Sequence, residues 1–318
     1  MQDIISAYED VNQVKDKKRT YFYVSSLGKC RRQVIFGMEG RKRKSYTVGE
    51  LNRFQSGTLS QRNWEYAWKR KDILLKSELY LPKVLGTDRF HGRIDDLLTN
   101  LTFNDDFFKR CDVYDPYDFL KKIKPTNIIL LEFKTARSYS FAYQDQMLRY
   151  PHQLQTWMYL LHLLKYMPSI KIQRHPLIFY VDRDGTNKPV LFVLDKPTLK
   201  KNYTILKKEM VNLVKAYVLF KKKKVLPDIL DRELKLVKKK IKDVIQYKIQ
   251  LKAYWECSYC KYHRACKLPK ERLKTNIIGT IKENKFEPNK NYEKFKKEID
   301  DKKINNLIKE LENGKTKV

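Results

Sequence analysis

The sequence predicts an α/β protein in which helices flank a central mixed β-sheet. Residues 73–81 alternate in polarity as a half-buried strand does, and residues 91–98 form a second strand candidate. Residues 127–134, Asn-Ile-Ile-Leu-Leu-Glu-Phe-Lys, are almost continuously apolar, which is typical of a strand covered on both faces. Long helix candidates at 51–71 and 143–166 precede and follow these strands. This order of elements predicts helices packed on a mixed sheet.

A hairpin and further helices follow the long helix candidate. Residues 176–182 and 189–194 predict two strands joined through the turn sequence Asp-Arg-Asp-Gly-Thr-Asn. We expect two more helices, at 198–220 and 229–250.

Two segments look like additions to this core. Residues 99–126 show little periodicity and predict a long loop or a small insertion between the second and third strands. Residues 270–318 are rich in Lys, Glu and Asn and contain one helix candidate, at 290–312. We therefore expect one domain over residues 1–269, with an insertion at 99–126, followed by a C-terminal extension over 270–318.

The composition indicates a folded protein with a polyanionic partner. Hydrophobic residues make up 42% of the 318 residues, which excludes wholesale disorder. The chain has 68 Lys+Arg against 37 Asp+Glu, a formal charge of +31, and nucleic acid is the simplest partner for such an excess. Glycine is scarce and forms no phosphate-binding motif, which argues against a nucleotide-driven motor.

The sequence shows neither a membrane helix nor a secretory signal. No stretch approaches the roughly 20 apolar residues that a membrane helix needs. The N-terminal residues have neither a basic region nor an apolar region of the signal-peptide type. We therefore expect an intracellular, cytoplasmic protein, or one in the host cell if the source is viral.

Two carboxylates and a lysine form the sharpest chemical pattern. Asp95 ends the stretch Gly-Arg-Ile-Asp on the second strand, and Glu132 and Lys134 flank Phe133 near the end of the third. Because side chains alternate along a strand, Glu132 and Lys134 should share one face and Phe133 should point the other way. Two carboxylates there would bind Mg²⁺ or Mn²⁺ through oxygen, and the lysine could stabilise charge on a phosphate.

The long helix candidate adds an amide and a phenol to this pattern. Gln155 and Tyr159 are four residues apart and therefore lie on one helical face. Such a pair could grip a phosphate or align a water. Each motif alone is weak, and the order in which they occur makes a functional site the favoured interpretation.

The cysteines indicate a second metal centre. Cys257, Cys260 and Cys266 have a Cys-x2-Cys-x5-Cys spacing, which is typical of metal binding. The fourth ligand could be His263, which would give a zinc-like set. It could instead be Cys30, which would give four thiolates and suit an iron–sulfur cluster. The spacing alone leaves both open.

The chain resembles the PD-(D/E)XK nuclease superfamily, and within it the RecB-like exonuclease branch, in which the same motifs occur in this order. The resemblance implies a restriction-endonuclease-like core with Asp95, Glu132 and the main-chain carbonyl of Phe133 as ligands of a divalent metal. It implies that Lys134 is a catalytic lysine and that Gln155 and Tyr159 support the active site. An upstream Gly-x-x-x-His motif is matched by Gly57-Thr58-Leu59-Ser60-Gln61, so Gln61 replaces the usual histidine ligand. An amide oxygen is a weaker ligand, so metal preference or activity could be altered.

The cysteines resemble those of iron–sulfur nucleases of this branch, which include the CRISPR-associated exonuclease. One cysteine precedes the nuclease motifs there and a Cys-x2-Cys-x5-Cys set follows them. The resemblance implies that Cys30, Cys257, Cys260 and Cys266 hold a [4Fe–4S] cluster that staples the N- and C-terminal parts together. Cys111 is then an ordinary thiol.

These patterns together predict a metal-dependent deoxyribonuclease. By resemblance it would be an exonuclease on single-stranded ends, and we expect 5′→3′ polarity. It would serve recombination, repair, replication or CRISPR-type processing, with a recombination or CRISPR-adaptation protein as partner. Two other functions stay open. One is a weakened nuclease fold that serves as a DNA-binding or assembly subunit, which Gln61 favours. The other is a zinc-stabilised RNA-binding protein, which requires His263 as a ligand.

The sequence also suggests where nucleic acid is held. Residues 196–252 carry 18 basic and 5 acidic residues, whereas residues 270–318 carry 14 and 9. We therefore expect one wall of the groove in 196–252. The expected DNA-binding lysines are Lys221, Lys222, Lys223, Lys224, Lys238, Lys239 and Lys240. Basic residues and aromatic rings that could stack on bases lie together early in the chain: the rings are Tyr21, Tyr23, Trp64, Tyr66 and Trp68, and the basic residues are Arg53, Arg62, Lys69 and Arg70. Trp64 and Trp68, four apart on a helix, fit a core better.

Overall fold

The chain divides into two compact units, each described here by itself. The computed structural model describes residues 18–41, 45–195, 201–224, 226, 234–241, 244–251, 260, 262, 266, 276–282, 285–295, 304–306 and 308–309. The first unit comprises residues 1–40 and 45–225, and the second comprises residues 41–44 and 226–318. No helix in the described ranges is both long and apolar enough to cross a membrane.

The first unit is built on a mixed sheet. Its strands are β1 (Phe22–Tyr23), β2 (Leu74–Leu81), β3 (Phe90–Leu98), β4 (Asp112–Tyr114), β5 (Ile129–Ala136), β6 (Leu177–Asp182) and β7 (Val190–Val193). Within the described residues they form a seven-stranded sheet in the order β1-β3-β5-β6-β7-β4, with β2 paired to β3. β5 and β6 are parallel, whereas β3 is antiparallel to both β2 and β5. The predicted mixed sheet is confirmed.

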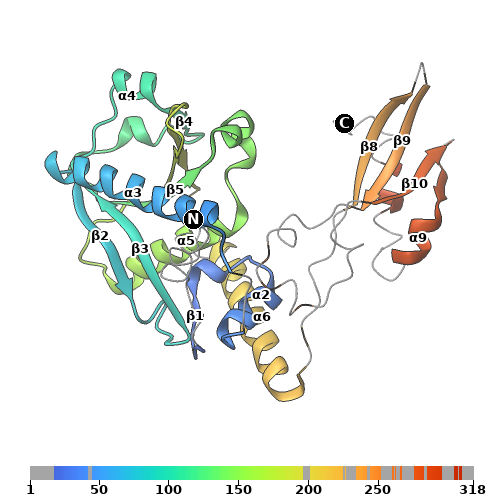
Figure 1. The fold of residues 1–318 in the computed structure, drawn as a ribbon. Coiled ribbons are helices and arrows are strands. Elements are labelled where there is room, and N and C mark those ends of the chain that lie inside the picture. The colour runs from blue at the N-terminus through green and yellow to red at the C-terminus, as the bar shows by residue number, and fades with distance from the viewer. Residues whose placement is uncertain are drawn as a thin grey trace, which may run out of the picture. The chain divides into compact units, whose positions relative to one another are not determined.

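Helices cover both faces of this sheet (Figure 1). They are α2 (Arg31–Met38), α3 (Val48–Arg70), α4 (Asp105–Arg110), α5 (Tyr150–Tyr166) and α6 (Lys201–Lys223), with short 3-10 turns η1 (Val24–Ser26), η2 (Leu120–Lys122) and η3 (Ser138–Gln146). Phe133 of β5 packs against Trp68 of α3. Leu130, three residues earlier on β5, points to the other side of the strand and packs in the cluster that contains Leu154 and Met158 of α5. Because strand side chains alternate, α3 and α5 lie on opposite faces.

Local signals explain where the two long helices begin. Thr47 caps α3 in a reciprocal capping box with Glu50, so the helix starts three residues before the predicted Leu51. α5 starts at Tyr150, with Pro151 in its first turn, rather than at the predicted residue 143. The intervening residues Ser138–Gln146 form η3 instead.

The predicted hairpin is present and its turn is tied to Asp182. β6 and β7 pair antiparallel. The Asp182 carboxylate is buried and accepts hydrogen bonds from the side chains of Ser138, Thr186 and Asn187 and from main-chain amides of the turn. Burial alone would raise the pKa of Asp182, but these hydrogen bonds outweigh it and lower the pKa to about 2.

The second unit contains a β-sheet where a helix was predicted. β8 (Leu234–Ile241) and β9 (Val244–Leu251) form an antiparallel hairpin, so the helix expected at 229–250 is wrong. In β9, Ile245, Tyr247 and Ile249 alternate with polar residues, and this period of two favours a strand. The sheet continues with β10 (Asn276–Lys282) and β11 (Lys285–Pro288), and the helix α9 (Lys290–Phe295) follows. Among the described residues of this unit, the strand order in the sheet is β11-β10-β9-β8.

Candidate nuclease site

The site lies where strands β3 and β5 separate. These strands pair over Asp96–Leu98 and Ile129–Leu131, and the pairing ends there. One residue further along, the Asp95 carboxylate takes the place of a strand partner: its Oδ2 accepts a hydrogen bond from the Phe133 amide at 2.9 Å. Because the strands separate here, the Phe133 amide of β5 donates to the Asp95 side chain instead of to the backbone of β3.

Glu132 and Lys134 lie together on the α5 face, as the alternation of the strand predicts. Lys134 forms an ion pair with Glu132 Oε1, and Gln155 Nε2 donates to the same oxygen at 2.7 Å. The Lys134 ammonium also lies 3.6 Å from Asp95 Oδ2 and donates to the Phe133 carbonyl at 3.1 Å. One cationic group thus contacts all three groups that the sequence predicts as metal ligands.

The electrostatics of this cluster follow from its burial. The Glu132 side chain is 1% exposed, and burial raises its pKa well above the ordinary value, with the neighbouring Asp95 charge adding to the effect. Burial opposes the charged form of Lys134, but the carboxylates of Glu132 and Asp95 outweigh it and raise the pKa of the lysine. Lys134 therefore stays cationic. Its positive charge stabilises the neighbouring carboxylates of Glu132 and Asp95, which would otherwise repel each other.

One carboxylate oxygen is left for a further ligand. Glu132 Oε2 is buried and has no hydrogen-bond partner among the described residues. A buried, unpartnered carboxylate oxygen is unfavourable unless a cation or a donor satisfies it. Asp95, Glu132 and the Phe133 carbonyl form an all-oxygen donor set, which fits Mg²⁺ or Mn²⁺. Within the described ranges no three His, Cys, Asp or Glu side chains form a metal-binding group, so this set depends on its main-chain member.

Tyr159 connects the helix to strand β3 rather than to the carboxylates. Its hydroxyl accepts a hydrogen bond from the Arg93 amide at 3.1 Å, and its ring lies against Gly92. A Cβ atom at Gly92 would approach Tyr159 Cε1 to 2.4 Å, so only glycine fits beneath the ring. Burial raises the pKa of Tyr159 and keeps the hydroxyl protonated. Tyr159 thereby fixes α5 on the strand that carries Asp95.

Gln61 lies beside a group of acidic residues that sequence reasoning missed. Its amide nitrogen donates to Glu65 Oε1 at 2.8 Å and to Glu78 Oε1 at 3.4 Å. Burial raises the pKa of Glu65, and the charges of Glu78 and Asp95 add to it, so Glu65 belongs to the same electrostatic environment as Asp95. Glu65 follows Gln61 by one helical turn, and this spacing was a signal that could have found it.

Asp96 is a second residue without a predicted role. It is fully buried, and neither carboxylate oxygen has a hydrogen-bond partner in the described part of the chain. Burial raises its pKa to about 8, with contributions from Glu65 and Asp95. At neutral pH the side chain is therefore mainly protonated.

His152 was also missed, although it precedes Gln155 by three residues on the same helix. Its Nδ1 lies 2.6 Å from the Tyr180 hydroxyl, which donates to the Met147 carbonyl, so Nδ1–H is the donor in this pair. Burial lowers the pKa of His152 to about 3, and the positive charge of Lys134 adds to the effect. A neutral imidazole thus lies close enough to Lys134 to feel its charge, and the spacing His152, Gln155, Tyr159 marks one helical face.

The predicted cluster ligands are described only in part. Cys30 precedes α2 in the first unit and is half-buried, and Cys260 and Cys266 are half-buried in the second. Cys257 and His263 lie outside the described residues. Cys111 is buried in the insertion, where burial raises its pKa to about 12, as suits an unreactive thiol.

The predicted DNA-binding lysines lie in both units. Lys221, Lys222 and Lys223 form the last turn of α6, and Lys224 follows it; all four are exposed. Lys221 is also 3.3 Å from Glu39, which neutralises part of its charge. Lys238, Lys239 and Lys240 lie in β8, whose side chains at these positions are outside the described set.

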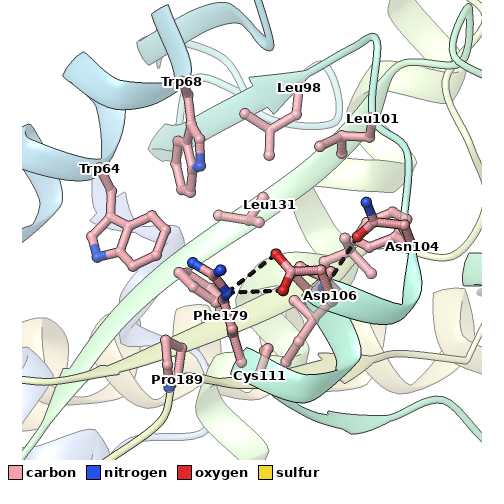
Figure 2. A pocket seen from close by; sticks show the side chains of 15 residues that line it. Trp64, Trp68, Leu98, Leu101, Asn104, Asp106, Cys111, Leu131, Phe179 and Pro189 are labelled. Carbon is pink, nitrogen blue, oxygen red and sulfur yellow. Dashed lines mark hydrogen bonds and ion pairs between the residues drawn. The ribbon is translucent and has the colours of Figure 1, made fainter. Parts of the chain in front are cut away.

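The tryptophans of α3 line an apolar pocket on the face of the sheet opposite Glu132 (Figure 2). Trp64 and Trp68 pack near Phe179, and Trp68 also packs near Phe133. The pocket has a volume of about 330 Å³ and is closed on one side by the insertion helix α4. The two rings therefore belong to the core region beneath α3, as expected, and not to an exposed stacking surface.

One comparison with known proteins gave a match. The model of the PD-(D/E)XK nuclease superfamily matches residues 116–267, a little under half of the chain. No curated protein and no solved structure matches the chain. The matched segment contains Glu132, Lys134, Gln155 and Tyr159, whereas Asp95 lies upstream of it. The part of the chain that supplies most of this site is similar to the PD-(D/E)XK nucleases, and that similarity indicates a nuclease.

Proposed function

We propose that this protein is a divalent-metal-dependent deoxyribonuclease. The observation that carries the proposal is the buried Oε2 of Glu132, which has no hydrogen-bond partner in the described part of the chain. It lies beside Asp95, the Phe133 carbonyl and Lys134. Asp95, Glu132 and the Phe133 carbonyl would hold Mg²⁺ or Mn²⁺, which supplies Lewis-acid polarisation of a phosphodiester.

The protein side chains have separate tasks in this proposal. Gln155 holds Oε1 of Glu132 and so fixes the orientation of the carboxylate. Lys134, kept cationic by its two neighbours, would stabilise negative charge that develops on the phosphate. Tyr159 positions the strand that carries Asp95. Gln61 occupies the usual histidine position, and we propose it as an auxiliary ligand through its amide oxygen.

Replacement of Glu132 tests the proposal. Glu132→Gln should lower cleavage of labelled DNA at least about 100-fold, because a neutral amide no longer pairs with the cation or with Lys134. The same variant should lose the increase in melting temperature that Mg²⁺ or Mn²⁺ gives the wild-type protein. Glu287→Gln is the matched control, since Glu287 pairs with Lys282 in the second unit. Full activity in Glu132→Gln would refute the assignment.

The finer features of the activity are proposed from the resemblance of the motifs. We propose an exonuclease that acts on single-stranded ends, with 5′→3′ polarity, in recombination, repair, replication or CRISPR-type processing. Strands labelled at either end, with a circular single strand as control, distinguish polarity and mode. Cleavage of the circle would show an endonuclease.

A [4Fe–4S] cluster held by Cys30, Cys257, Cys260 and Cys266 is proposed on the same resemblance. Absorbance near 400 nm and iron analysis of anaerobically purified protein test it. Cys30→Ser should remove both signals, whereas Cys111→Ser, at a buried thiol, should keep them. Zinc without iron would favour His263 as the fourth ligand.

A non-catalytic DNA-binding or assembly subunit is the second candidate. The observation that favours it is Gln61, whose amide nitrogen is engaged by Glu65 and Glu78. Gln61→His should raise cleavage if the amide limits the activity. DNA binding without cleavage in both proteins would support the subunit.

A further inference from the structure

An exposed group of aromatic rings lies at the junction of β1, β2 and β3. Tyr21 stacks flat on His91, with ring centroids 3.7 Å apart and an interplanar angle of 4°. Tyr23 meets Tyr21 edge-on at 5.5 Å, and Tyr80 meets His91 at 6.1 Å. We call Tyr21, Tyr23, Tyr80 and His91 the aromatic surface. Tyr23 is 39% exposed and Tyr80 is 50% exposed, so two of its rings present area to solvent.

Hydrogen bonds hold these rings in place. His91 Nε2 lies 3.1 Å from the Asp88 carbonyl, which can only accept, so Nε2 is the donor. In the neutral ring Nδ1 then accepts from the Tyr80 hydroxyl, at 2.8 Å. The Arg19 guanidinium lies over the Tyr23 ring, 4.6 Å from its centroid. The rings are thus pre-organised, which reduces the entropy that binding would cost.

The surroundings of the aromatic surface are basic. The two segments that build it, residues 18–23 and 80–93, contain five basic residues and one acidic residue, Asp88. The Arg93 side chain is 63% exposed and forms an ion pair with Glu78 at 2.6 Å, which neutralises part of its charge. Planar rings with positive charge around them match unpaired bases joined by phosphates.

The aromatic surface also lies on the strand that leads to the site. His91 and Asp95 are four residues apart on β3, which is roughly 13 Å at about 3.3 Å per residue. A strand whose bases stacked at His91 and Tyr80 would therefore have its phosphates within reach of Asp95.

We propose that the aromatic surface binds unpaired bases of single-stranded DNA next to the site. This inference rests on the proposed nuclease function and deepens it by assigning the residues that bind the unpaired bases of the substrate. It adds to the basic residues a stacking contact that selects bases freed from a duplex, because paired bases have no accessible ring faces.

Binding of a fluorescent oligothymidine to the full chain tests the proposal, measured without divalent metal so that cleavage does not contribute. Tyr80→Leu and Tyr23→Leu should each weaken binding about 5- to 100-fold, the range expected for one stacked base. Tyr80→Phe keeps the ring and should stay within about 3-fold of wild type. The slope of log affinity against log salt should be unchanged in every variant, because stacking neutralises no phosphate.

Tyr114→Leu is the matched control. Tyr114 is 42% exposed, stacks on Phe192 and lies on β4, at the opposite end of the strand order. It should bind the oligonucleotide as wild type does. Blunt duplex DNA should bind equally to all variants. Thermal melting checks that each variant folds. If Tyr80→Leu does not fold, Tyr80→Trp is tested instead, and it should bind the oligonucleotide at least as tightly as wild type.

Unchanged binding in Tyr80→Leu and Tyr23→Leu would overturn the proposal, as would an equal loss in Tyr114→Leu. Loss of self-association with unchanged DNA binding would identify the aromatic surface as a contact between copies and would also overturn it. Failure of the nuclease proposal is distinguishable, since it would appear as absent cleavage while the tyrosine variants still lose binding.

Discussion

Gly92 has no side chain, and its small size determines how Tyr159 packs at the site. It lets the Tyr159 ring lie on β3, where the hydroxyl meets the Arg93 amide. The Gly-x-x-Asp and Gln-x-x-x-Tyr motifs are therefore parts of one contact: the glycine makes room for the tyrosine, and the aspartate follows three residues later on the same strand.

Gly92→Ala should lower the free energy of unfolding by about 1–3 kcal/mol, because the added Cβ would lie 2.4 Å from a buried ring that cannot move freely. Nuclease activity should fall with it, since the helix that carries Gln155 must shift. Urea unfolding and DNA cleavage measure the two effects. Gly49→Ala is the control, because no atom of the residues that the structure describes lies within 4 Å of a Cβ there. A variant as stable as wild type would show that the ring can move aside.

His152 should impose a pH dependence on stability. Its pKa is lowered to about 3 in the folded protein, whereas an unfolded histidine titrates near 6.5. The unfolded chain therefore binds more protons between these values, and the free energy of unfolding should fall as pH decreases from about 6.5 towards about 3. Urea unfolding at pH 7.5 and pH 5 should show a larger loss in wild type than in His152→Gln. Equal losses would contradict the buried, neutral ring.

At the scale of elements, the β6–β7 turn depends on one carboxylate. Asp182→Ala should destabilise the protein by about 1–3 kcal/mol at pH 7, because it removes the acceptor for several donors in the turn. The Asp182 pKa is lowered to about 2, so its contribution is present above pH 4 and is lost as pH falls towards 2. The stability difference between wild type and Asp182→Asn should shrink over that range in denaturant titrations. A constant difference would mean that the carboxylate charge is not what the turn uses.

Elements with a strong local signal were predictable from the sequence. The apolar run at 127–134 became β5, and the alternation at 73–81 became β2, because burial on two faces or one face leaves those patterns. The helix expected at 229–250 was wrong, because the lysines and branched residues there fit both a helix face and a strand. The strand form is stabilised by the pairing of β8 with β9 and of β9 with β10, which the sequence pattern does not reveal.

The residues of the candidate site that lie in sequence motifs were predictable, and the others were not. Asp95, Glu132, Lys134 and Gln155 lie in named motifs, and the structure brings them together. Glu65, Asp96 and His152 carry no motif, and their place depends on how α3 and α5 pack on the sheet, which spacing alone does not fix.

At the scale of the whole molecule, the charge of +31 should dominate DNA binding. Each phosphate neutralised on a single strand contributes about −0.7 to the slope of log affinity against log salt, and we expect a slope of several units. Charge reversal at Lys222 and Lys223 with Lys238–Lys240 should flatten this slope in titrations of fluorescent DNA.

A shortened tail is the control for that experiment. Deletion of residues 275–318 would remove β10, which pairs with both β9 and β11, so the shorter deletion of residues 310–318 is used instead. The shorter deletion should leave the slope unchanged. Loss of binding on this deletion alone would place the main DNA contact in the tail.

Asp95 and Glu132 reach the site from two stretches of chain that are joined through the insertion. Residues 100–103 of that insertion belong to no helix or strand. A chain expressed as two polypeptides broken there would carry one of the two proposed metal ligands on each piece. The pieces should be inactive apart and should regain cleavage when β3 and β5 pair again, which would make the activity a reporter of fragment reassembly.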